Sequence, residues 1–352
     1  MDRTYYQQLA ASGLRMPIGA DLILHEQPDP EAALNDGQRY GQVIEQTARR
    51  FNTPLALPVM DLTLEKVAML GLLGIPADQA PSYHFEEPPT DEAVQTAGQK
   101  WDRLPHPRYQ TQMDAIRYIA EKTDLLPMGM SIGPFSLTTK LMADPIVPVY
   151  MAGKGISAED DPEVAIVERC LAMSTEFVLH AVEAQVRAGA KAVCIAEPAG
   201  SAFYVSPIQM EEGSDIFDRY VIAPNRRIRE LLDDLGADLF FHCCGQLNDG
   251  MLRRYAELDP AVLSLGSSRK LWEDAKIVPE RTVLFGNLPS KRFYSDREMS
   301  REQVEAAAIE LLEHMRAIGR PFILGSECDV LDVPGCHEII MSKVDAFMQA
   351  GR

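Results

Sequence analysis

From about residue 126 onward, the sequence alternates between short, almost continuously apolar runs and longer amphipathic stretches. Such runs are typical of parallel strands buried on both faces, and the longer stretches have the spacing of helices that cover a sheet. Two of these stretches end at Gly189 and Gly236, and an apolar run follows each at once. The apolar runs are 126–134, 191–198, 237–245, 261–267, 282–289 and 321–328, with an earlier one at 55–61 and a weaker one at 21–25.

Eight such runs in one uninterrupted chain of 352 residues predict a (β/α)8 barrel that forms a single domain, 1–352. A doubly wound open sheet is the alternative, and it is disfavoured because no Gly-x-Gly-x-x-Gly turn follows a strand. The segment 62–124, which contains Tyr83, Phe85 and Trp101, is long for one strand-to-helix connection. We expect it to form either a lid over the active face or a helical cover on the rim of the barrel.

The charge of the chain restricts its partners. With 34 Lys and Arg against 52 Asp and Glu, the net charge is −18, which argues against binding to nucleic acid or to an anionic membrane. No apolar run reaches the ~18 residues that a membrane span needs, and the first residues lack the apolar core of a signal peptide. We therefore expect a cytoplasmic protein. In that reducing compartment the six cysteines are core residues, nucleophiles or metal ligands.

The most specific local pattern is His-Cys-Cys-Gly at 242–245, at the end of a predicted strand. Residues i and i+2 of a strand share a face, so His242 and Cys244 point to one side and Cys243 to the other. One imidazole and one thiolate can chelate zinc, and Cys328, which ends another predicted strand, could supply a third ligand. Three protein ligands leave a tetrahedral position free, as catalytic zinc requires. The alternative is that these residues only fill the core, where cysteine is common.

Other polar residues end predicted strands, and catalytic groups of a barrel lie at those ends. Glu197, before Pro198, could be a displaceable fourth zinc ligand, a general base, a hydrogen-bond partner of His242 or a helix cap. Asp61 is a candidate acid, although it also has the sequence context of a helix N-cap. Ser267 and Asn287 end two further strands, and we expect them to contact the cofactor.

These pieces together resemble the uroporphyrinogen decarboxylase superfamily and, within it, the zinc-dependent corrinoid methyltransferases such as methylcobamide:coenzyme M methyltransferases. The resemblance covers the chain from about residue 50 to its end and includes the segments 132–135, 197–199 and 285–288. It implies a barrel, and it implies that His242, Cys244 and Cys328 are zinc ligands. It also implies a corrinoid, which comes free or on a partner protein because this chain has no Asp-x-His-x-x-Gly motif.

The sequence departs from the superfamily at two places. Decarboxylases carry an arginine-rich segment near the N-terminus, whereas the segment 16–21 here has no arginine. Methyltransferases commonly have an acidic residue at the end of the strand after His-x-Cys, whereas this strand ends in Ser267. The first departure counts against porphyrinogen decarboxylation, and the second leaves Glu197 or water as the fourth zinc ligand.

The predicted activity is methyl transfer between a corrinoid and a thiol acceptor. The alternative is the methyltransferase component of an O-demethylase, which passes a methyl group from an aryl methyl ether to a corrinoid protein. A non-catalytic zinc barrel and a metal-free decarboxylase that uses Asp61 are further hypotheses. The sequence identifies neither the physiological donor or acceptor nor the oligomeric state.

Overall fold

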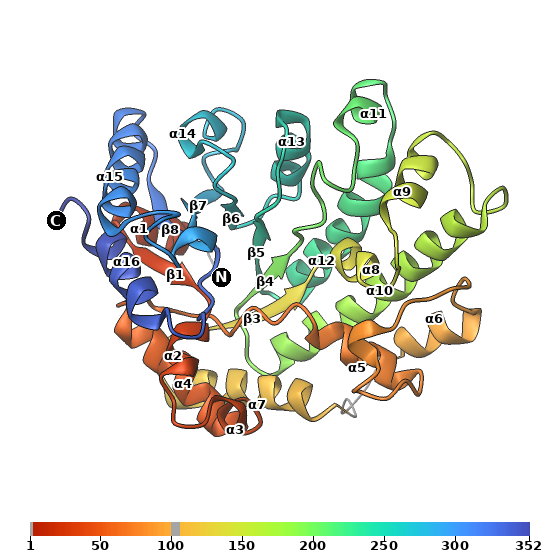
Figure 1. Cartoon of the computed structure of the whole chain (residues 1–352), viewed down its shortest axis with the longest axis horizontal. Helices are drawn as coiled ribbons and strands as arrows, with labels where there is room; N and C mark the ends of the chain where they lie inside the picture. The colour runs from red at the N-terminus through yellow and green to blue at the C-terminus, as the bar shows by residue number, and fades with distance from the viewer. Residues whose placement is uncertain (1–2, 100–105) are drawn as a thin grey trace.

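The computed structural model describes residues 3–99 and 106–352, so that Trp101 lies outside the described residues. Eight parallel strands form one sheet in the order β1-β8-β7-β6-β5-β4-β3-β2. Figure 1 shows this sheet curling, with helices on its outside, which confirms the predicted (β/α)8 barrel type. The strands are β1 Arg15–Ile18, β2 Leu55–Ala56, β3 Leu126–Ile132, β4 Ala192–Ala196, β5 Asp238–Cys243, β6 Val262–Leu265, β7 Val283–Leu288 and β8 Phe322–Asp329.

Helices connect successive strands, as the alternating pattern predicts. The helices are α1 Thr4–Ala11, α2 Asp21–His25, α3 Pro30–Leu34, α4 Gly37–Arg50, α5 Leu64–Leu72, α6 Asp91–Ala97, α7 Pro107–Lys122, α8 Pro134–Thr139, α9 Ile146–Gly153, α10 Pro162–Arg187, α11 Pro207–Glu211, α12 Ala223–Asp234, α13 Asp249–Glu257, α14 Leu271–Asp274, α15 Arg301–Ala317 and α16 His337–Gln349. Short helical turns lie at Ala80–Ser82 (η1), Asp218–Ile222 (η2) and Ser290–Arg292 (η3). Among the described residues, no helix combines the length and the apolar character that crossing a membrane requires.

The prediction of a strand at 21–25 is wrong. These residues form helix α2, and the first strand is the preceding segment Arg15–Ile18, which pairs with β8. A short apolar run has the same pattern whether it is a buried strand or a buried helical turn. Gly19, at φ +80°, ends the strand and turns the chain into the helix. Proline within a strand pattern argues against a strand, and Pro17 in β1 therefore hides this one.

The predicted run 55–61 is a strand over only two residues, Leu55 and Ala56. Beyond it, side chains bind the backbone in place of a neighbouring strand: the Val59 N–H donates to Tyr40 Oη, and the Met60 N–H donates to Asp329 Oδ2 at 2.9 Å. Asp329 ends β8, so its carboxyl group connects β8 to the segment after β2. β1 and β2 are the two edge strands of the curled sheet, and they share no strand pairing among the described residues. The contact of Asp329 with Met60 lies between these two edges.

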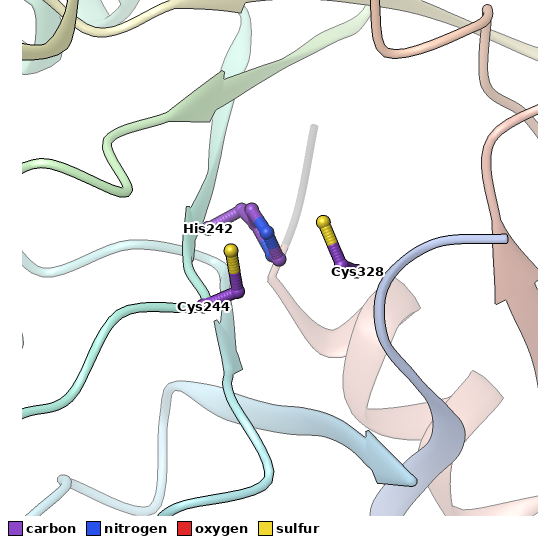
Figure 2. A group of neighbouring side chains, drawn as sticks. All are labelled: His242, Cys244 and Cys328. Atoms are coloured by element: carbon purple, nitrogen blue, oxygen red, sulfur yellow. The ribbon is translucent and has the colours of Figure 1, made fainter. Parts of the chain in front are cut away.

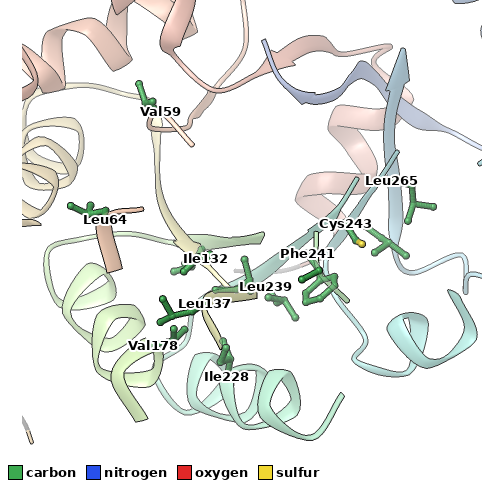
Figure 3. Packing of buried hydrophobic residues seen from close by; sticks show 14 of the residues in the cluster. Val59, Leu64, Ile132, Leu137, Val178, Ile228, Leu239, Phe241, Cys243 and Leu265 are labelled. Atoms are coloured by element: carbon green, nitrogen blue, oxygen red, sulfur yellow. The ribbon is translucent and has the colours of Figure 1, made fainter. Parts of the chain in front are cut away.

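Two apolar layers fill the fold, and the strands alternate between them. Inside the barrel, Phe240 packs with residues such as Met128 and Phe285. On the outer face, Leu239 and Phe241 belong to the larger cluster between strands and helices (Figure 3). This alternation continues to the end of β5, where it buries Cys243 in the outer layer, as predicted.

The segment 62–124 contains α5, η1, α6 and α7. Helix α7 packs against α4 and β3 and is therefore the ordinary helix of the second β/α unit. The part before it lies against α10, where Arg169 donates to the Pro89 carbonyl and pairs with Asp91 at 2.7 Å. Phe85 also donates its N–H to the Leu141 carbonyl after α8. A lid function for this segment stays a prediction.

Candidate metal centre

The ends of β5 and β8 bring His242, Cys244 and Cys328 together. One ligand atom from each residue lies within 4.8 Å of the others, and no further His, Cys, Asp or Glu of the described residues joins this group. Figure 2 shows the imidazole and the two sulfurs facing one another across the barrel. Cys244 and Cys328 are 84 positions apart, and they meet because the curled sheet turns β5 and β8 toward each other.

His242 is oriented by the neighbouring strand. Its ladder partner on β6 is Ser264, and the Nδ1 atom lies 2.9 Å from Ser264 Oγ. An imidazole that keeps its proton on Nδ1 donates it to this hydroxyl and leaves the lone pair of Nε2 free. Nε2 is fully buried and has no hydrogen-bond partner among the described residues. A buried nitrogen without a partner costs free energy unless it binds something.

The two thiols are electrostatically coupled. The pKa of Cys244 is lowered because its sulfur accepts a hydrogen bond from Cys328 and lies beside His242 and Lys291, against the opposing effect of burial. The pKa of Cys328 is raised because its thiol donates that hydrogen bond and is itself buried next to the charge of Cys244. One imidazole nitrogen and two cysteine sulfurs are a donor set that zinc prefers. The residues present therefore fit a zinc ion.

Comparisons with known proteins bear on this arrangement. The family profile described as "Uroporphyrinogen decarboxylase (URO-D)" matches residues 25–350, which is most of the chain. The chain belongs to the uroporphyrinogen decarboxylase family. Among curated proteins, the methylcobamide:CoM methyltransferase MtaA of Methanosarcina barkeri is 27% identical over 194 residues, which are 54% of this chain and 51% of that protein. The chain thus spans about half the length of the curated relative that it matches.

A solved structure has the same fold. The structure of a methyltransferase from Methanosarcina mazei superposes with a TM-score of 0.64 at 18% sequence identity, and the match covers 96% of each chain. At this identity the similarity establishes the shared architecture. The membership of the uroporphyrinogen decarboxylase family and the barrel confirm the expectations drawn from the sequence.

Glu197 does not belong to the group formed by His242, Cys244 and Cys328. Its carboxylate is fully buried and accepts hydrogen bonds from the Ser136 N–H at 2.6 Å, the Phe135 N–H at 3.3 Å and Asn225 Nδ2 at 2.9 Å. Two of these donors are the first N–H groups of α8, so Glu197 anchors the start of that helix. Its own N–H donates to the His242 carbonyl at 2.8 Å, which couples it to the metal group through the backbone.

Asp61 lies in the turn before α5. Its carboxylate accepts hydrogen bonds from the N–H and the hydroxyl of Thr63 and pairs with Arg108 at 3.4 Å. The N-cap of α5 is Thr63, and this helix has no side-chain capping bond, so Asp61 lies two residues before the cap and is not the N-cap that its sequence context suggests. Asp61 is also not among the residues gathered at the two thiols.

Asn287 and Ser267 both shape the loop after β6. Asn287 Nδ2 donates to the carbonyls of Gly266 and Arg269 at 2.8 and 2.9 Å. The Ser267 N–H donates to Glu327 Oε2 at 3.0 Å, and Glu327 directly precedes Cys328. This side of the site is therefore a connected network that fixes the loop next to β8. A direct contact of either residue with a cofactor stays a prediction.

Sequence reasoning missed Lys291, Glu327 and Ser264. Lys291 lies in the turn η3 after β7, where no motif distinguishes it from a surface lysine. Its pKa is raised: burial lowers it, and the negative charges of Cys244, Cys328 and Glu327 more than offset that effect. Ser264 could have been found from the strand register, since it stands opposite His242.

The other four cysteines lie outside the group. Cys170, Cys194 and Cys243 are fully buried, and burial raises the pKa of each thiol. Cys336 precedes α16 and packs partly against the core. Their placement indicates a role in packing.

Proposed function

We propose that the protein is a zinc-dependent enzyme that transfers a methyl group between a corrinoid and a thiol acceptor. The observation that carries this proposal is the buried Nε2 of His242, which has no partner among the described residues and faces two thiols. The similarity to a methylcobamide:CoM methyltransferase supports the same chemistry.

Each residue of the group has a role that follows from its contacts. Cys244 and Cys328 would hold the metal through sulfur, and His242 through the Nε2 atom that Ser264 orients. Bound zinc lowers the pKa of an incoming thiol and so supplies a thiolate at neutral pH. Three protein ligands leave one position for that thiol. Glu197 is occupied by α8 and Asn225, so in our proposal it fixes the backbone around His242, and water fills the fourth position at rest.

The corrinoid would come from outside the chain, free or bound to a partner protein, because the sequence carries no Asp-x-His-x-x-Gly motif. Decarboxylation of a porphyrinogen is less well supported. Arg15, the one arginine near the segment 16–21, donates to the carbonyls of Phe347, Met348 and Ala350 at the end of α16. It is therefore engaged by a helix end and not by the site, and a polycarboxylate would also meet a net charge of −18.

Metal analysis and a visible-spectrum assay test the proposal. We expect about one zinc per chain in the purified protein, and demethylation of methylcobalamin when thiols are supplied. His242→Ala should lose both zinc and activity, whereas Cys336→Ser, a cysteine outside the group, should keep both. A panel of aryl methyl ethers with a reduced corrinoid tests the opposite direction of transfer. Absence of zinc, or absence of transfer with every thiol and ether tried, contradicts the proposal.

A further inference from the structure

A cleft lies at the end of the barrel where β1 and β8 begin. Its volume is about 450 Å³, within the range of ~300–1,000 Å³ that is typical of small-molecule sites. Arg15 is the first residue of β1 and Phe322 the first of β8, whereas Cys328 lies near the other end of β8. The ends of α1 and α15 form the remaining walls, and Figure 1 shows both helices beside β1 and β8. The cleft is therefore separate from the group of His242 and the two thiols.

The lining of the cleft combines apolar surface with positive charge. The larger apolar side chains include Leu14, Leu312, Met315 and Phe322. The charged side chains are those of Arg15, Arg316 and Arg320. Acids outnumber bases 52 to 34 in the chain, yet no Asp or Glu of the described residues lines this cleft. An acidic protein thus gathers three cations around one patch of apolar surface.

Backbone carbonyls fix two of these arginines without neutralising them. Arg15 Nη1 donates to three carbonyls at the end of α16, with the shortest contact, 2.7 Å, to Ala350. Arg320 Nη2 also donates to three carbonyls, with the shortest contact, 2.7 Å, to Pro279. Within the described residues no hydrogen bond uses Nε or the other Nη of either side chain. Each guanidinium has five N–H donors, so both keep donors for a ligand while their positions are fixed.

None of the three arginines has a carboxylate oxygen within 4 Å in the part of the chain that the structure describes. Burial and the nearby charge of Arg352 lower the pKa of Arg15, and burial lowers the pKa of Arg320 more than Glu280 raises it. Arg316, in the last turn of α15, is exposed. A guanidinium without a counter-charge attracts an anion, and it binds a carboxylate or a phosphate through two parallel hydrogen bonds.

We propose that this cleft binds an amphiphilic anion, with a carboxylate or phosphate head group on the arginines and an apolar body over Leu312 and Phe322. The ligand contacts α1, α15, β1 and β8 at once, so its binding stabilises the folded chain by mass action. This inference goes beyond the proposed methyl transfer and does not depend on it, because the cleft and the metal group lie at opposite ends of β8.

Isothermal titration calorimetry of the full chain with octanoate and with octyl phosphate tests the proposal. We expect one ligand per chain and a Kd below about 1 mM for at least one of the two, and the tighter ligand identifies the head group. Octanol, which lacks the charge, and acetate, which lacks the apolar body, should each bind at least about tenfold more weakly. Shortening the alkyl chain by one methylene should weaken binding up to about fourfold.

Three variants locate the site. Arg316→Gln should weaken binding of the tighter ligand about tenfold, and the exposed position of Arg316 leaves the fold intact. Arg301→Gln removes the same charge at the exposed opposite end of α15 and should bind as wild type. His242→Ala should also bind as wild type, because the metal group lies at the other end of the barrel.

Four results would overturn the inference: no saturable binding of either ligand, equal affinity for octanol, equal weakening in Arg301→Gln, or loss of binding in His242→Ala. A cation in the last turn of a helix also stabilises that helix through its dipole. Lower stability of Arg316→Gln with unchanged affinity would therefore assign Arg316 to the helix end alone, and this result too would overturn the inference.

Discussion

Glu65 gives the sharpest test of how the barrel is stabilised. Its carboxyl group lies on α5 and is 1% exposed, next to Ser131 and the backbone of Ile132 on β3, with Asp61 and the ring of Tyr109 nearby. Neither carboxyl oxygen has a hydrogen bond of good geometry within the described residues. Burial is the main cause that raises the pKa of Glu65 from 4.5 to about 8. The folded protein therefore keeps the carboxyl group protonated at neutral pH.

The sign of the effect follows from proton binding. Between pH 4.5 and 8 the unfolded chain releases this proton and the folded chain retains it, so the free energy of unfolding falls as pH rises. One pKa unit corresponds to 1.36 kcal/mol, so the loss reaches about 3 kcal/mol near pH 7 and levels off near pH 8. Glu65→Gln keeps the shape of the side chain and removes the titrating group. It should raise the free energy of unfolding by about 4 kcal/mol at pH 7.5 and by less than about 1 kcal/mol at pH 5.

Urea unfolding at both pH values measures this difference, with Glu230→Gln on the exposed face of α12 as the control. The informative quantity is the change in the effect of Glu65→Gln between pH 5 and pH 7.5. An equal effect at the two pH values, or destabilisation at pH 7.5, would refute the assignment of a buried, protonated Glu65.

Two further predictions concern the site and its support. Ser264→Ala removes the partner of His242 Nδ1 and should weaken zinc binding about 10–100-fold in competition with a fluorescent chelator, and an unchanged affinity would argue against this orienting role. Gly133→Ala makes a Cβ atom clash with Oε2 of Glu197, whose carboxylate is held by three hydrogen bonds, and should cost about 2 kcal/mol of stability. Gly71→Ala, in open space on α5, is the matched control and should leave stability equal or higher in the same urea titration.

The sequence predicted the barrel because its strands are buried on both faces and its helices are amphipathic. Periodicity also placed His242 and Cys243 on opposite faces of β5, as the two apolar layers show. Periodicity failed at α2, because a segment of five residues is too short to show whether it repeats as a strand or as a helix. It missed β1 because Pro17 and the short length hide that strand.

At the site, the grouping of the three residues was predictable because all three end predicted strands and because His242 and Cys244 share one face of a strand. That they bind zinc is implied by the family resemblance and stays a prediction. Glu197 was correctly identified as a special residue, but the spacing could not reveal that α8 and Asn225 occupy its carboxylate. Lys291 could not be predicted, since the effect of the two thiols on its pKa depends on how the turn after β7 lies against β8. Contacts that depend on loop placement leave no periodic trace in a sequence.

The central claim is that His242, Cys244 and Cys328 hold a zinc ion with one open position for a thiol. Zinc K-edge X-ray absorption on the zinc-loaded protein tests it directly, before and after addition of a small thiol. We predict two sulfur ligands, one imidazole nitrogen and one light atom at rest, and three sulfurs after the thiol is added. A site that keeps the same four ligands with and without thiol, or that shows no sulfur at all, would contradict the account.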